Sequence, residues 1–158
     1  SKNALKELQK RVQNAAATKR LDIGDLDLAA LPEKIFEMED LRAMQAQGNK
    51  IEVLPASIGR LRMLTQLRLF GNKLRWLPSE IGECIAMQVM WLQDNHLIAL
   101  PNSIGQLQQL KILNLARNPL RSLPVDLTNC ASLKELDIEG LDEYLSIPPV
   151  DVVRAGLP

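Results

Sequence analysis

The residues best suited to chemistry are three carboxylates at alternating positions, Glu135, Asp137 and Glu139. Alternate side chains of a strand project to one face, so these three would form an acidic row. Such a row could bind a divalent cation, and two carboxyl groups can act together as general acid and base. No histidine or cysteine lies beside it, so we predict no metal site and no catalytic residue. We expect a secondary acidic site for a basic partner segment or, equally, a solvated edge.

The histidine and the two cysteines offer no nucleophilic site. His96 follows Asn95 and is expected to be an exposed turn residue. Cys84 and Cys130 occupy the same position of a repeat described below, about 10 Å apart, which is beyond disulfide reach. They are therefore expected to be small buried hydrophobes. Because no Ser-His-Asp or Cys-His arrangement is apparent, we predict that the chain is not an enzyme and needs no cofactor.

Composition limits the class of protein. The 158 residues include 46% hydrophobic side chains and carry no formal net charge, which suits one domain with a sizeable core. Balanced charge disfavours a nucleic-acid partner, because nucleic acids attract clustered Lys and Arg. The apolar runs are far shorter than the roughly 20 residues that span a bilayer, so we expect no membrane insertion. Two cysteines indicate no disulfide framework, which favours a cytoplasmic location and leaves the nucleus as an alternative.

A period of 23 residues organises most of the chain. Shifting the sequence by this interval superposes prolines, asparagines and two apolar columns. No unit can close a core by itself, so the units must stack. The prolines are Pro32, Pro55, Pro78, Pro101 and Pro124; the asparagines are Asn49, Asn72, Asn95 and Asn118; the apolar columns are Leu21, Met44, Leu67, Met90, Leu113 and Leu136, and Ile23, Ala46, Leu69, Leu92, Leu115 and Ile138.

Each unit is expected to begin with a short strand whose alternate apolar side chains point inward. The asparagine lies where the chain leaves the strand, and its amide can satisfy backbone groups of the turn. The proline has no N–H to donate, so it disfavours a long helix on the return path. The buried asparagines should form a polar ladder.

Both ends depart from the period. Residues 1–17 have apolar side chains at helical spacing and predict a helix that caps the first strand, with Ser1 or Asn3 as its N-cap. The alternative is a membrane-surface helix, because positions 1–20 hold six basic residues and one glutamate. Residues 18–148 comprise six repeats, and residues 149–158 offer only a short C-terminal cap. Either the chain is truncated there or a partner completes the closure.

The unit LxxLxxLxLxxNxLxxLPxxIGxL is almost intact from Leu61 to Leu77 and again from Leu107 to Leu123. It resembles the intracellular leucine-rich repeat proteins of the Ras-scaffold type, including the plant intracellular Ras-group-related proteins and the arrays that precede Roc GTPase domains. The ending PPVDVVRAG is similar to the segment that closes such arrays. The resemblance implies a curved α/β solenoid with parallel strands on its concave face and irregular or short helical segments on its convex face. It also implies cytosolic scaffolding of a small GTPase, kinase or phosphatase, and it supplies no catalytic residue.

The outward-facing strand columns bring two aromatic residues close together. Phe70 and Trp91 are predicted to fall on neighbouring strands, about 5 Å apart in the ladder direction. An apolar centre with a polar edge is typical of interaction sites, so we predict a partner-binding patch here. The alternative is that the two rings merely cover each other on a flat sheet. The anchors are Phe70, Trp91, Val89 and Ile112, and the orienting groups are Arg68, Asp94 and Arg117.

Trp76 lies outside this patch, on the loop before Leu77, and is expected to be partly buried against the neighbouring repeat.

Taken together, the repeat and the predicted patch indicate a non-catalytic protein-interaction module, a cytosolic signalling scaffold. Two alternatives stay open. The basic N-terminal and acidic C-terminal ends could stack head to tail as a structural assembly. The chain could also be the regulatory segment of a longer enzyme.

Overall fold

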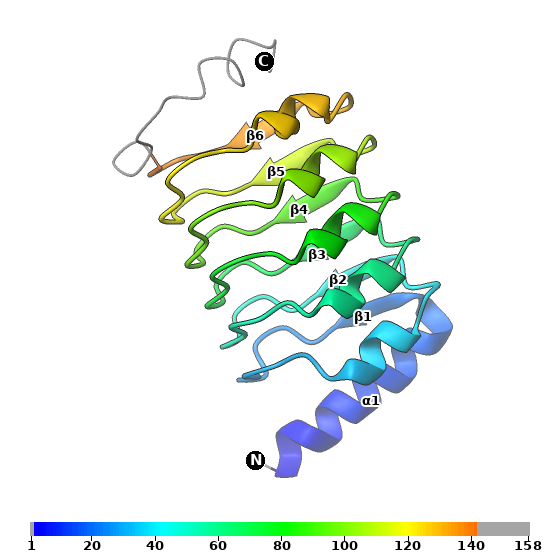
Figure 1. Ribbon diagram of the computed structural model, residues 1–158. Coiled ribbons are helices and arrows are strands. Elements are labelled where there is room, and N and C mark those ends of the chain that lie inside the picture. Colours follow the sequence, from blue (N-terminus) through cyan, green and yellow to red (C-terminus); the bar gives the residue numbers. More distant parts are fainter. Residues whose placement is uncertain (1, 142–158) are drawn as a thin grey trace.

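The computed structural model describes residues 2–141 and forms one sheet of six parallel strands (Figure 1). The strands follow chain order across the sheet, from β1 to β6, and each pairs with the next without a shift in register. Equivalent residues of successive repeats therefore lie side by side. The strands are β1 (Arg20–Asp22), β2 (Ala43–Gln45), β3 (Gln66–Arg68), β4 (Val89–Trp91), β5 (Ile112–Asn114) and β6 (Glu135–Asp137).

The central residue of each strand points into the core. Leu21, Met44, Leu67, Met90 and Leu113 are buried, whereas the residues on either side of them are mostly half-buried or exposed. This alternation follows from the two-residue period of a strand. The flanking residues form what we call the strand face, the outer face of the sheet. The single sheet of parallel strands, with one side of every strand facing the core, confirms the predicted leucine-rich repeat solenoid.

The return path of each of the first five units holds a single turn of 3-10 helix instead of a long helix. The N-cap of each turn is the recurring proline, which suits a segment that needs no backbone donor at its start. Adjacent turns pack on one another along the side opposite the sheet. The turns are η1 (Glu33–Glu37), η2 (Ala56–Arg60), η3 (Ser79–Glu83), η4 (Asn102–Gln106) and η5 (Val125–Asn129).

Helix α1 (Lys2–Thr18) covers the N-terminal end of the stack and packs against β1. Leu8 and Ala15 are buried there, and Val12 packs against the same core. Asn3 lies within the helix, so the predicted N-cap role of Asn3 is wrong, and Ser1 lies outside the described residues. The predicted C-terminal cap at residues 149–158 also lies outside them.

A buried ladder of asparagines joins the coils, as the sequence predicts. Asn95 illustrates the pattern: its Oδ1 accepts from the Leu74 N–H at 3.0 Å, and its Nδ2 donates to the carbonyls of Leu69 and Leu92 at 2.9 and 3.0 Å. Each amide thus satisfies backbone groups of two neighbouring coils, which have no sheet partner at the turn. Four asparagines share this role, Asn49, Asn72, Asn95 and Asn118.

Candidate protein-binding face

The strand face brings together three of the four predicted anchors. Val89 and Ile112 are direct partners in the register of β4 and β5, and Trp91 ends β4 next to Arg68 of β3 and Asn114 of β5. All three anchors are half-buried. Val89 and Ile112 therefore form an apolar row across two strands. Trp91 lies two residues after Val89 in β4, on the same face of the sheet.

The structure places Phe70 outside the strand to which the sequence assigned it. It lies beyond the end of β3, and the register places Arg68 opposite Trp91. Phe70 therefore stands in the next row, in the column of Gln47 and Gln93. This is the column that the 23-residue period predicts for Phe70, and it lies beside the column of Trp91. The two residues are therefore diagonal neighbours.

Arg68 covers the tryptophan instead. Its guanidinium carbon lies 4.1 Å from the centroid of the Trp91 ring, within the range of a cation–π interaction. The Arg68 Nε is enclosed and has no hydrogen-bond partner among the described residues. The guanidinium charge is thus held over the indole, while the Nε donor of Arg68 stays without a hydrogen bond in this part of the chain.

Two further polar atoms near the aromatic residues have no partner. The amide oxygens of Gln47 and Gln93, the neighbours of Phe70 in its column, are enclosed and unbonded among residues 2–141. Enclosed polar groups are bonded in the great majority of cases, because an unbonded one carries a desolvation cost. One donor and two acceptors on the strand face therefore lack the partners that a bound chain could supply.

Asp94 and Arg117 form the rim of this area as a bonded pair. Arg117 donates to both carboxylate oxygens of Asp94, at 2.7 and 2.8 Å, and also to Glu139 at 3.3 Å. The hydrogen bond from Arg117 lowers the pKa of the Asp94 carboxyl. Both residues have positive φ, near 55°. They occupy the column filled elsewhere by Gly48, Gly71 and Gly140, so the turn fixes their direction.

The acidic row is less free than its spacing suggests. Glu135, Asp137 and Glu139 are exposed; the first two belong to β6, and Glu139 lies two residues beyond its end. Asp137 accepts from the Asn114 amide at 3.0 Å and from the Glu139 backbone N–H at 3.1 Å. Glu139 is bonded to Arg117. The side chain of Glu135, alone of the three, forms no hydrogen bond or ion pair within the described part of the chain.

Trp76 is more exposed than the predicted partial burial against the neighbouring repeat. Its side chain is 51% exposed. Leu77 takes the inward direction at this point, so the preceding residue faces outward. The residues in the same column of the adjacent repeats, Val53 and Ala99, are too small to cover an indole. The period predicts this column, and the small size of its other members is the signal in the sequence for the exposure of Trp76.

The cysteines and the histidine lie as predicted. Cys84 and Cys130 are free, buried, and each donates its thiol to a carbonyl at 3.2 Å, that of Ile58 or Ile104. Burial raises the pKa of Cys84 to about 12 and that of Cys130 to about 11, so both stay protonated at neutral pH. His96 is exposed in its turn.

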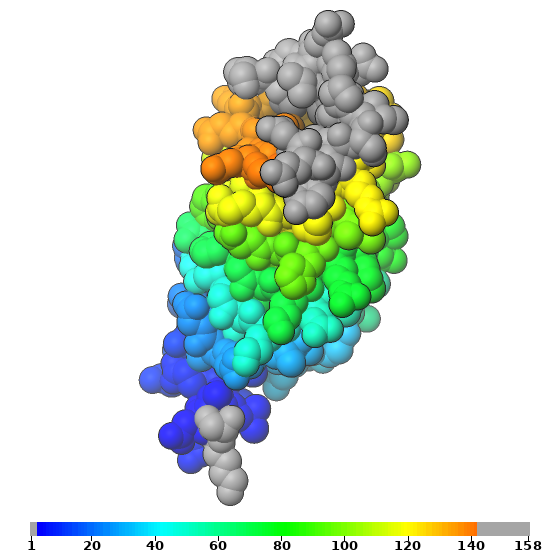
Figure 2. Space-filling model, turned by 90° about the vertical axis from the view of Figure 1, so that its left-hand side faces the viewer, coloured from blue at the N-terminus to red at the C-terminus, as the bar shows by residue number. Residues whose placement is uncertain are grey.

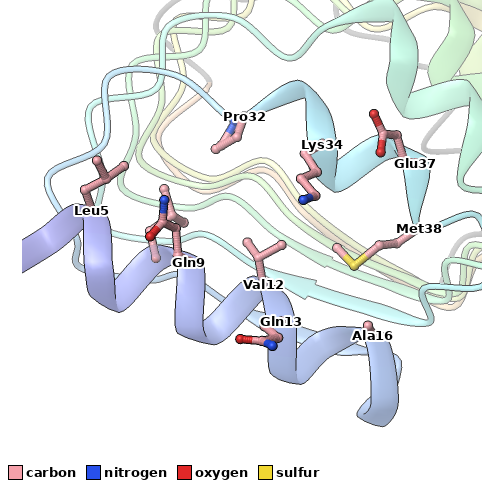
Figure 3. A pocket seen from close by; sticks show the side chains of 10 residues that line it. Leu5, Gln9, Val12, Gln13, Ala16, Pro32, Lys34, Glu37 and Met38 are labelled. Carbon is pink, nitrogen blue, oxygen red and sulfur yellow. The ribbon is translucent and has the colours of Figure 1, made fainter.

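A cleft that the sequence analysis missed separates helix α1 from η1 (Figure 3). Its volume is about 760 Å³. Apolar groups of the helix, including Leu5 and Val12, face Pro32 and Met38 across it, with Lys34 and Glu37 at one side. The signal for it was the modest apolar stripe of the helix, which β1 covers only in part.

Residues 2–141 contain no group of three or more histidine, cysteine or acidic side chains placed to hold a metal ion. They also contain no helix with the length and apolar character needed to cross a membrane.

Comparison with known proteins places the chain among leucine-rich repeats. The family model for the Leucine Rich Repeat matches residues 109–130. A leucine-rich repeat protein of Leptospira interrogans superposes with a TM-score of 0.70 and 37% identity, covering 82% of this chain and 39% of that protein. A comparison with curated proteins finds no match.

Two plant receptors are also similar in structure. The leucine-rich repeat ectodomain of the membrane receptor kinase GASSHO1/SCHENGEN3 from Arabidopsis thaliana, in complex with CASPARIAN STRIP INTEGRITY FACTOR 2, has a TM-score of 0.68 and 30% identity, covering 76% of this chain and 15% of the receptor. The plant peptide hormone receptor RGFR1, in complex with RGF2, has the same TM-score and identity, covering 75% and 20%. The chain therefore spans well under half the length of these three proteins.

Proposed function

Because the chain is a leucine-rich repeat protein, we propose that it is a non-catalytic protein-interaction module whose strand face binds an extended segment of a partner protein. Trp91, Val89, Ile112 and Phe70 are the proposed apolar anchors, and Arg68, Asp94 and Arg117 orient the partner. Support comes from two structural relatives that are found in complexes, the receptor kinase ectodomain with CASPARIAN STRIP INTEGRITY FACTOR 2 and the peptide hormone receptor RGFR1 with RGF2.

The observation that carries this proposal is the set of unbonded polar atoms beside the aromatic residues. Arg68 Nε can donate, and the amide oxygens of Gln47 and Gln93 can accept. A peptide backbone offers both kinds of group in a regular row, and small rotations of these half-buried side chains would present them to it. A rigid, preformed sheet also lowers the ordering cost of binding.

The proposed setting is a cytosolic signalling scaffold, with a small GTPase, kinase or phosphatase as partner. The resemblance of the repeat unit to Ras-scaffold proteins supports this setting, as do the two free thiols of Cys84 and Cys130. The acidic row Glu135, Asp137 and Glu139 is a proposed secondary site for a basic segment. If the chain belongs to a longer enzyme, the same face would serve to recruit its substrate or regulator.

The test is a pull-down from lysate with three baits: the intact chain, a Phe70→Ala/Trp91→Ala double variant, and Trp76→Ala as a control that removes the other tryptophan. We expect the double variant to lose partners that the Trp76→Ala variant retains. Circular dichroism of each bait checks that it is folded. Identical partners for the intact chain and the double variant would show that the anchors are wrong.

Head-to-tail assembly is a second candidate, favoured by the charge of the two ends. Positions 1–20 carry six basic residues and one glutamate, and β6 presents the acidic row. Some basic groups are already paired, such as Arg11 with Glu7 and Lys19 with Asp40. Sedimentation at low and high salt distinguishes the two candidates, because assembly through opposite charges should weaken as salt rises.

A further inference from the structure

We propose a second docking surface, distinct from the strand face, which binds an acidic peptide segment through apolar side chains. It lies on the side where the chain turns after each strand, the side that faces the viewer in Figure 2. We call it the turn flank and define it as Val53, Trp76 and Ile98 with Lys73 and Arg75.

Three large apolar side chains on three successive repeats make up its centre. Val53, Trp76 and Ile98 are 50%, 51% and 50% exposed. Backbone hydrogen bonds hold the coils side by side here, from Lys73 N–H to the Ile51 carbonyl at 2.9 Å and from Ile98 N–H to the Arg75 carbonyl at 3.2 Å. Val53 shares the column of Trp76, and Ile98 shares that of Arg75. Single exposed apolar residues are common, but a tryptophan with an exposed aliphatic side chain on the coil at either side marks an interaction site.

The charge around this centre is mainly positive. Lys73 and Arg75 lie in the same coil as Trp76, are exposed, and form no ion pair within 4 Å in the described part of the chain. Lys50 is bound to Asp27. One acidic residue, Glu52, lies in the column of Arg75, one repeat earlier. A partner with carboxylates beside its apolar groups would therefore meet complementary charge, and Arg75 can hold a carboxylate with two hydrogen bonds.

The same surface suits a bilayer or a second copy of the chain less well. Anchoring to an anionic membrane requires several basic groups, and here Glu52 interrupts a small positive area. The acidic row of a second copy, Glu135 to Glu139, lies on a strand that offers no exposed large apolar side chain. A flexible acidic segment with an aliphatic or aromatic anchor satisfies both requirements.

The experiment selects ligands from a random peptide library displayed on phage, with the intact chain as the target. Selected peptides are then synthesised and their affinities measured for four proteins: the intact chain, Trp76→Ala, a Lys73→Glu/Arg75→Glu variant and Trp91→Ala. Trp76 and the two basic residues are exposed, so the variants should fold normally, and circular dichroism verifies this.

We expect one class of selected peptides to contain Asp or Glu beside an apolar residue. These should bind Trp76→Ala at least about tenfold more weakly and Trp91→Ala unchanged. Replacing their acidic residues by lysine should abolish binding to the intact chain and restore binding to the charge-reversed variant. Rescue of this kind requires direct charge contact at Lys73 and Arg75.

Three results would overturn the proposal. The first is a selection without peptides that depend on Trp76, or with Trp76-dependent peptides that are not acidic. The second is binding to vesicles of equal parts phosphatidylcholine and phosphatidylserine that Trp76→Ala abolishes. The third is self-association of the intact chain that Trp76→Ala abolishes. Trp91→Ala is measured in parallel, so peptides that bind the strand face are identified by their dependence on Trp91 and are distinguished from peptides that bind the turn flank.

Discussion

The interior of the solenoid and its outer surfaces use the same period in opposite ways. Inside, each column repeats one residue type, as in the asparagine ladder, because every coil faces the same neighbours. Outside, columns vary: the column of Trp91 contains Asp22, Arg68 and Asn114. Interior columns therefore carry stability, and outer columns are free to carry binding. Substitutions should separate these two roles.

The largest expected effect is on the interior ladder. Asn95→Ala leaves the buried Leu74 N–H without its partner and removes one of two amide donors from the Leu69 and Leu92 carbonyls, which keep those of Asn72 and Asn118. The free energy of unfolding should therefore fall by about 3 kcal/mol. Urea denaturation measures it. The matched control is Asn102→Ala, an exposed asparagine of η4, which should change stability by less than about 0.5 kcal/mol. Equal effects would contradict the structural role of the ladder.

A second interior series depends on close packing of the 3-10 turns. A Cβ added at Gly82 would lie 2.6 Å from the Ser103 carbonyl oxygen, whereas one at Gly59 would come no closer than 3.1 Å to any atom. At Gly105 the Cβ would collide with the Asp126 carbonyl still more closely. We expect Gly105→Ala and Gly82→Ala to cost about 2 kcal/mol and Gly59→Ala less. Thermal unfolding of the three variants tests the order, and a reversed order would show that backbone shifts relieve the contacts.

The two tryptophans sharpen the comparison on the outer surfaces. Trp91→Ala removes a half-buried ring under Arg68 and should cost about 1–2 kcal/mol, while Trp76→Ala should stay within about 0.5 kcal/mol. Denaturant unfolding gives both values. Emission spectra add an independent check, because the exposed Trp76 should emit at longer wavelength than Trp91. A greater loss for Trp76→Ala would mean that the turn flank is packed in solution.

The smallest expected effect concerns the ion pair at the rim. Arg117 lowers the pKa of Asp94, so the pair favours the folded state above the ordinary carboxyl pKa, and this contribution is lost as the pH falls through the lowered pKa. Both groups are largely exposed, so global stability should change little. In an NMR titration, Arg117→Gln should raise the pKa of Asp94 and leave that of Asp40, which pairs with Lys19, unchanged. An unaltered Asp94 would show that the pair is absent in solution.

The fold could be predicted from the sequence because the 23-residue repeat determines which side chains are buried in every coil. The central strand residues, the asparagine ladder and the buried positions of Cys84 and Cys130 all follow from a strict period. The sequence-based prediction extended the third strand to Phe70, which lies beyond β3, and it expected more burial of Trp76 than the structure shows, since the exposure of an outer side chain depends on the neighbours that it meets. The cleft under helix α1 was missed because the angle between the helix and η1 is not encoded in the repeat.

The sequence by itself determined that the units stack, which face of each strand is buried, and where the chain turns. These outcomes are dictated by the spacing of apolar residues, asparagines and prolines, because no other arrangement buries them all. Only the tertiary structure decided that Arg68 covers Trp91, that Asp94 binds Arg117, and that Trp76 stays open. Those contacts join residues of different coils, and their formation depends on side-chain size, direction and competing partners.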